Sequence, residues 1–146
     1  ENGRDTAMAK AVEFTNVRIF EEETRRMPNF ALHELAHAYH DREIVGGFGN
    51  KPLKAAFERA KSSLTYEDVE RRDAQGRKHR GTAYAMTNPQ EYFAELSEAY
   101  FSRNDFFPYD RAELTKHDPD VVAVLAELWW DASESPDKSQ SDSGDP

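Results

Sequence analysis

The strongest constraint on the fold is a nearly apolar helix that carries three ionisable side chains. From Phe30 to Tyr39 every residue is apolar except His33, Glu34 and His37. A helix that is apolar nearly all round is typical of a buried element. Burying ionisable side chains is costly unless something pairs with them or ligates them. The segment therefore predicts a buried helix in which these three side chains have a chemical task.

The spacing of the three side chains is the HExxH pattern. His33 and His37 are one helical turn apart, so their imidazoles share a face, with Cβ atoms about 5–6 Å apart, and can converge on one zinc ion. Glu34 points about 100° further round the helix, where it can reach a water held by that ion. The pattern indicates a metal-activated nucleophile with a general base beside it. The alternative is a chance HExxH whose histidines are satisfied by hydrogen bonds.

Two residues further along this helix do not fit as the third ligand. Some zinc peptidases continue the pattern as HExxHxxGxxH, and here His40 occupies the glycine position and Glu43 the last ligand position. Without that glycine, we expect the helix to continue to Val45 and to end at Gly46-Gly47. Glu43 would then face away from the metal. His40, about 10 Å along the axis from the first histidine, is interpreted as a side chain that supports a ligand or faces solvent.

A second helical motif offers the missing ligand. Asn88 and Pro89 resemble a helix start, with Asn as N-cap and Pro at the first position. Glu91 at the third position could merely cap that helix. Glu95 lies one turn further on the same face, beside an apolar stripe made of Tyr92, Phe93, Leu96, Ala99 and Tyr100. Two stacked carboxylates on a core-facing helix suggest a metal ligand, Glu91, with Glu95 as its supporting partner.

These motifs carry a resemblance to known zinc peptidases. HELAH at 33–37 and YAMTNPQEYFAE at 84–95 resemble the catalytic domain of anthrax lethal factor and its zincin relatives. The Mlc titration factor type of peptidase is similar over the same stretches. A resemblance to secreted bacterial and fungal zinc peptidases covers most of residues 11–130, through the segments AVEF, HELAHAYHD, TNPQEYFAE, RNDFFP and HDP.

The resemblance implies a gluzincin-like zinc metalloendopeptidase with one Zn²⁺ per chain. Its ligands would be His33, His37 and Glu91, and Glu95 would orient one of them. Glu34 would take a proton from a zinc-activated water that attacks the peptide carbonyl, and would pass it to the leaving amine.

The resemblance also assigns a role to Tyr84, which falls where lethal factor has a tyrosine whose hydroxyl stabilises the oxyanion. From the residues alone, Tyr84 would be assigned to the core, because it lies in an apolar Ala-Tyr-Ala-Met run. Two other classes of protein stay open as alternatives. One is a catalytically inactive, zinc-stabilised protein-interaction module, and the other is a helical domain without metal.

The remaining segments predict a mostly α (α+β) fold with a central HExxH helix and a small β element. The resemblance implies that this fold is a minimal zincin-like metallopeptidase domain. We expect a strand at 11–14, helices at 17–26 and 52–64, and a last helix that begins at 118–119. A hairpin is expected within 65–83, turning at 73–76.

Length and composition limit the partners. The 146 residues suit a single domain, expected at 1–130 and followed by an acidic, disordered tail at 131–146. The net charge of −9 argues against nucleic acid as a partner, and no apolar run is long enough to predict a membrane span. The chain has no cysteine, which excludes disulfides and thiolate ligands. The expected partner is a peptide or protein substrate.

Five basic residues gather around Gly76, namely Arg71, Arg72, Arg77, Lys78 and Arg80. We interpret them as a solvated hairpin or loop. They precede Tyr84 closely enough to line a cleft, so a preference for acidic substrate side chains is an alternative. The chain opens with Glu1 and shows no signal-peptide pattern, which is compatible with a processed or excised part of a longer protein. The oligomeric state and the compartment are not predicted, although the resemblance points to secretion.

Overall fold

The computed structural model describes residues 29–72, 75 and 77–130, and this part of the chain is mostly helical. Its helices are α2 (Phe30–Arg42), α3 (Lys51–Ser62), α4 (Pro89–Phe101), α5 (Arg111–His117) and α6 (Pro119–Trp130). Two strands, β1 (Val69–Arg72) and β2 (Lys78–Gly81), and two 3₁₀ turns, η2 (Gly47–Gly49) and η3 (Tyr84–Met86), complete it. The predicted class, mostly α with a small β element, is confirmed.

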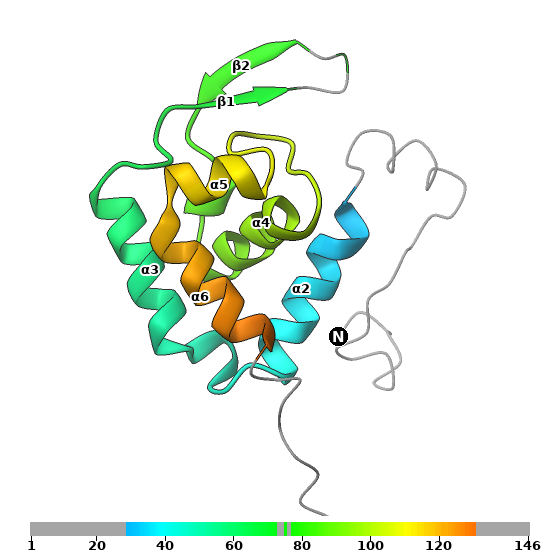
Figure 1. The fold of residues 1–146 in the computed structure, drawn as a ribbon, viewed down its shortest axis with the longest axis vertical. Helices are drawn as coiled ribbons and strands as arrows, with labels where there is room; N and C mark the ends of the chain where they lie inside the picture. The colour runs from blue at the N-terminus through cyan, green and yellow to red at the C-terminus, as the bar shows by residue number, and fades with distance from the viewer. Residues whose placement is uncertain (1–28, 73–74, 76, 131–146) are drawn as a thin grey trace, which may run out of the picture.

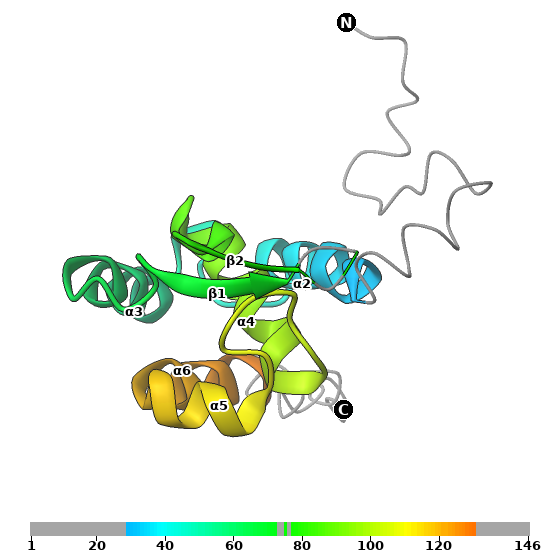
Figure 2. The same ribbon diagram turned by 90° about the horizontal axis from the view of Figure 1, so that it is seen from above.

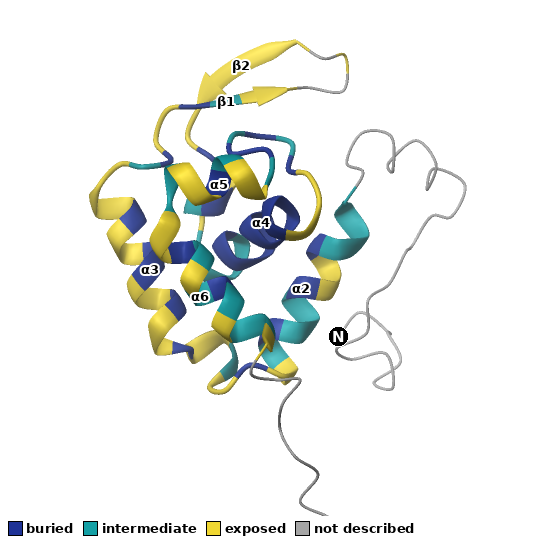
Figure 3. Ribbon diagram, viewed as in Figure 1, coloured by how far each residue is buried: buried dark blue, intermediate teal, exposed yellow. Residues whose placement is uncertain are grey.

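Helix α4 is the central element. Figure 1 shows it surrounded by α2, α3, α5 and α6, and Figure 2 shows it between the hairpin and the α5–α6 pair. Every residue from Tyr92 to Tyr100 is buried (Figure 3). The helix begins as predicted, with Pro89 in its first turn and the Asn88 side chain accepting a hydrogen bond of 2.9 Å from the Glu91 N–H.

Helix α2 packs against α4 on one face only. His33, Ala36 and His40 are buried on that face, whereas Leu35 is 56% exposed. The prediction of a helix buried all round is therefore wrong for the described residues, because nothing among them covers the opposite face. The expected strand at 11–14, the helix at 17–26 and the tail at 131–146 lie outside the described residues.

The C-terminal end of α2 also differs from its prediction. The helix ends at Arg42, before Val45, and Ile44 leaves it to become buried with 6% of its surface exposed. Gly46 and Gly47 then turn the chain with φ of 84° and 50°, a left-handed conformation that favours glycine. The glycine turn is where the sequence predicts it, but the helix ends earlier because burial of Ile44 requires a change of direction before the glycines.

The His40 side chain is buried and packs between aromatic rings. It is neither exposed to solvent nor hydrogen-bonded to a proposed metal ligand. It is 1% exposed, and its ring centroid lies 5.0 Å from that of Phe48 and 4.9 Å from that of Phe93. Among the described residues its ring nitrogens form no well-aligned hydrogen bond, and the backbone of Gly47 is a polar group close to the ring. Burial, followed by the charge of His37, lowers the pKa of His40 to about 4. The prediction for His40 was wrong because Phe48, from the glycine turn, covers it.

The predicted hairpin is present. Strands β1 and β2 pair antiparallel with Val69 opposite Gly81, and the bend between them lies largely outside the described residues. The other edge of β1 is joined to the segment before α5 by backbone hydrogen bonds of 3.1 Å from Arg72 N–H to Asp105 and 2.7 Å from Phe107 N–H to Glu70. The hairpin is thereby fixed above α4 (Figure 2).

Helices α3 and α6 complete the core. The predicted face of α3 is buried at Leu53, Ala56, Phe57 and Ala60. Leu64 was expected to extend this face, but α3 ends before it, and Leu64 is 66% exposed with φ of 57°.

No helix in the described part of the chain is long and apolar enough to cross a bilayer.

The buried His40 predicts a pH-dependent stability. Because folding lowers its pKa from 6.5 to about 4, in that interval the unfolded chain binds a proton that the folded chain does not. The stabilisation that neutral His40 contributes is complete above pH 6.5 and is lost as the pH falls towards 4. The free energy of unfolding should decrease over this interval by at most about 3 kcal/mol.

The measurement is the free energy of urea unfolding at neutral pH and at mildly acidic pH. The wild type should lose more stability on acidification than His40→Phe, which has no proton to bind. His79→Phe, a substitution of an exposed histidine, is the matched control and should behave like the wild type. An equal loss in the wild type and in His40→Phe would contradict this account.

Candidate metal centre

The packing of α2 on α4 brings the three predicted ligands together. Nε2 of His33 lies 3.1 Å from Nε2 of His37 and 3.1 Å from Oε2 of Glu91, and His37 Nε2 lies 3.4 Å from the same oxygen. Zinc bound tetrahedrally at about 2.0–2.1 Å holds its ligand atoms about 3.3–3.4 Å apart. The spacing of the three atoms and the set of two imidazoles and one carboxylate therefore fit a tetrahedral metal site.

Each helix contributes to this convergence through its local geometry. On α2 the two imidazoles stand one turn apart, with ring centroids separated by 4.8 Å and planes at 81°. On α4, Glu91 lies in the first turn, where its backbone N–H takes part in the cap while its carboxylate faces the histidines. The alternative in which Glu91 merely caps the helix does not account for the position of this carboxylate.

Two buried carboxylates lie behind His33. Oε1 of Glu98 is 2.9 Å from His33 Nδ1, and Oε1 of Glu95 is 3.5 Å from the same nitrogen. An Nδ1–H that donates to Glu98 leaves the lone pair of Nε2 free to face His37 and Glu91. The closer of the two oxygens thus belongs to a residue that the sequence analysis omitted. The missed signal is the spacing of Glu91, Glu95 and Glu98, which recur at i, i+4 and i+7 on one face of α4.

Without a metal ion, burial and the neighbouring charges shift the pKa values within this cluster in different directions. Burial lowers the pKa of His33, but the hydrogen bond to Glu98 and the surrounding carboxylate charges outweigh burial and raise the pKa to about 9. Burial and then the charge of Glu98 raise the pKa of Glu95 to about 8. Burial and the positive charge of His33 lower the pKa of His37. A divalent cation can replace the proton of His33, because the same negative charge attracts both.

Glu34 and Tyr84 lie on the accessible side of this cluster. Glu34 is exposed on α2, and Tyr84, in η3 just before α4, is 52% exposed. The alternative that assigned Tyr84 to the core is therefore wrong. The charge of Glu91, followed by burial and the charges of Glu95 and Glu34, raises the pKa of Tyr84. Its hydroxyl stays protonated at neutral pH and lies within electrostatic reach of the site.

The basic residues of the hairpin are largely paired. Arg71 contacts Asp105 at 3.0 Å, Lys78 contacts Glu70 at 2.9 Å, and Arg80 binds an aspartate of the preceding loop at 3.0 Å. Exposed ion pairs of this kind contribute little to stability. The pairing also offsets much of the positive charge near Tyr84, so it does not favour the alternative of a preference for acidic substrates.

The class of protein follows from comparison with known families. An HExxH helix packed on a second helix with an acidic residue suits a metallopeptidase, and a metallopeptidase family model matches the chain. That model, glucose-regulated metallo-peptidase M90, matches residues 12–129, and the chain belongs to this family. Membership implies a metal ion and a peptide or protein substrate. A search of curated proteins found no match, and neither did a search of solved structures.

The resemblance to metallopeptidases is thus confirmed at the level of the class. The likeness to lethal factor, the gluzincin subtype and the identity of the metal stay predictions.

Glu98 should control the affinity of the site for metal. Glu98→Gln is expected to weaken zinc binding about 10- to 100-fold, because an amide accepts a weaker hydrogen bond from His33 and carries no charge. Titration of the metal-free protein with Zn²⁺ against a competing chelator measures the Kd. Glu58→Gln, at an exposed position of α3, is the matched control. If both variants bind zinc as the wild type does, Glu98 does not support the site.

Proposed function

We propose that this chain is a zinc-dependent metalloendopeptidase that holds one Zn²⁺ through His33, His37 and Glu91. The observation that supports this most strongly is the convergence of the three ligand atoms, at 3.1–3.4 Å from one another, across the α2–α4 interface. Family membership supplies the metallopeptidase class, and two imidazoles with a carboxylate form a donor set that catalytic zinc accepts. The acidic ligand from a separate helix makes the arrangement gluzincin-like.

Glu34 is the general base of this proposal. Bound zinc would supply Lewis acidity, which polarises a carbonyl oxygen and makes water nucleophilic near neutral pH. Glu34 follows His33 directly and is exposed, so its carboxylate is available to take a proton from that water and to deliver it to the leaving amine. Its charge opposes the lowering of the His37 pKa and contributes to the raised pKa of Tyr84, so Glu34 lies within electrostatic reach of both side chains.

Tyr84 and the buried carboxylates of α4 have complementary roles. The protonated hydroxyl of Tyr84 would donate a hydrogen bond to the oxyanion that forms as the peptide carbonyl is attacked. Glu98, with Glu95 beside it, would hold the ring of His33 in the orientation that presents Nε2 to the metal.

Metal content tests the ligand set. Elemental analysis of the purified chain should give one zinc per chain, and Glu91→Ala should lose this zinc or bind it far more weakly, because one of three ligands is removed. Glu127→Ala, which removes an exposed carboxylate from α6, is the control and should retain it. A wild type that takes up no zinc even after reconstitution would overturn the proposed site.

Hydrolysis tests the catalytic roles separately from metal binding. Glu34→Gln should retain zinc and lose about 100- to 10,000-fold in kcat/KM towards a fluorogenic peptide mixture, since the proton acceptor is gone. Tyr84→Phe should retain zinc and lose about 100- to 1,000-fold in kcat. Full activity in Glu34→Gln would remove that residue from the mechanism. A wild type that binds zinc and cleaves no peptide would support the alternative, an inactive zinc-stabilised interaction module.

A further inference from the structure

A cavity of about 320 Å³ lies beside Tyr84, between the hairpin and the segment that precedes α5. Part of its lining is apolar, from Val69, Ala83 and Phe106, each at most 5% exposed. The rest comes from Gly81, Tyr84 and the polar side chains of Arg71, His79, Arg80 and Thr82. Tyr84 lines this cavity, and it lies in η3, directly before the helix that carries the proposed ligand Glu91. The charges of Glu91, Glu95 and Glu34, which raise the pKa of Tyr84, agree with this position. The cavity therefore adjoins the place where the proposed reaction would occur.

The register of the hairpin explains why the cavity is hollow. Alternate residues of a strand share a face, so Val69 and Arg71 of β1 face the same way as their partners Gly81 and His79 of β2, and all four line the cavity. Gly81 contributes no side chain, and a Cβ added there would meet no atom within 4 Å. The glycine leaves open space opposite Val69, in the cavity that Tyr84 also lines.

The strand beside the cavity, β2, lies at the edge of the two-stranded sheet that the described residues form. β1 is bonded on both sides, to β2 and to the segment before α5. Among the described residues, β2 pairs with β1 alone, and its four residues are all exposed. An exposed strand edge can bind the backbone of an extended peptide, while neighbouring pockets receive alternate side chains.

We propose that this cavity is the specificity pocket of the peptidase and that it takes a large apolar or aromatic side chain from a substrate residue close to the scissile bond. This inference rests on the proposed function. The apolar part of the lining favours such a side chain, because burying a charge against Val69, Ala83 and Phe106 would be costly. The cavity volume, about 320 Å³, lies at the lower end of the range for ligand pockets, which is about 300–1,000 Å³. Arg71 and Arg80, which also line the cavity, are already bound to Asp105 and Asp68, so they do not require an acidic ligand.

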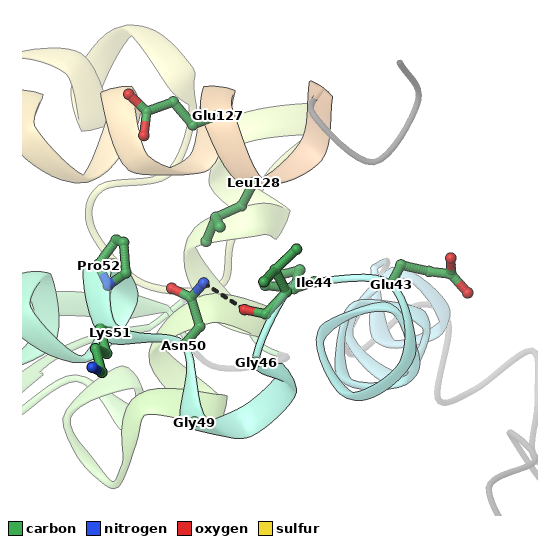
Figure 4. A pocket seen from close by; sticks show the side chains of 10 residues that line it. Glu43, Ile44, Gly46, Gly49, Asn50, Lys51, Pro52, Glu127 and Leu128 are labelled. Carbon is green, nitrogen blue, oxygen red and sulfur yellow. Dashed lines mark hydrogen bonds between the residues drawn. The ribbon is translucent and has the colours of Figure 1, made fainter. Parts of the chain in front are cut away.

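Gly81→Trp tests the pocket without disturbing the core. The Cβ position is open, and the backbone of Gly81 is not left-handed, so the substitution is compatible with the fold. Gly49→Trp is the matched control. Gly49 also has open space at its Cβ, and it lines a different cavity, of about 520 Å³, between the end of α2, the start of α3 and α6. Figure 4 shows this second cavity, with Gly49 opposite Leu128.

The experiment uses the zinc-loaded full chain and a randomised peptide library read by mass spectrometry, followed by two peptides that differ only in phenylalanine or alanine at the preferred position. The wild type should prefer the phenylalanine peptide by at least about 10-fold in kcat/KM. Gly81→Trp should abolish this preference by slowing the phenylalanine peptide alone, and Gly49→Trp should retain it. Gly81→Leu is a second, smaller variant and should reduce the preference by less.

The outcomes separate this inference from the function on which it rests. A wild type that cleaves peptides without a preference for large apolar residues, or with a preference for acidic ones, overturns the pocket and leaves the peptidase standing. A Gly81→Trp variant that retains zinc and the phenylalanine preference does the same. A zinc-loaded wild type that cleaves no peptide overturns both.

Discussion

The contact between α2 and α4 is the interaction on which the rest of this structure depends. It places His33 and His37 of one helix against Glu91, Glu95 and Glu98 of the other, with most of these groups buried. Carboxylates buried together repel one another and lose hydration, and they are tolerated where a positive charge offsets these costs or where one of them takes up a proton, as the raised pKa of Glu95 allows. The interface is thus built around a cation, a proton on His33 or a metal ion in its place. Binding a metal there would also stabilise the packing of the two helices.

The rest of the core holds α4 in register for this contact. Tyr92, next to Glu91 on α4, donates a hydrogen bond of 2.8 Å to Asp118 at the start of α6. Ser97, one turn beyond Phe93, accepts a hydrogen bond of 3.0 Å from the indole of Trp129. These bonds tie the start and the middle of the buried part of α4 to α6 and to the residue that precedes it. The ligand-bearing helix is therefore positioned by α6, although α6 supplies none of the proposed ligands.

Features of this fold that depend on residues close together in the sequence were predicted correctly, and features that depend on distant segments were not. The start of α4 at Asn88, the apolar face of α3 and the hairpin depend on contacts within a few residues, and all three were predicted. The predictions were wrong for the end of α2, for Leu35 and for His40. These three features depend on which distant segments cover a surface. Glu98 was missed for a related reason: α4 is buried all round, so the apolar pattern did not single out the face that α2 contacts.

The sequence by itself determined the chemistry that is available: two imidazoles one turn apart, a carboxylate beside them and a second helix with a capped start and an acidic face. Helical periodicity dictates those relations wherever the helices lie. Only the tertiary structure decided that His33, His37 and Glu91 meet at 3.1–3.4 Å, that Glu98 rather than Glu95 is the nearer partner of His33, and that a cavity opens at Gly81 beside Tyr84. These distances depend on how two helices and a hairpin pack, and no local pattern encodes that packing.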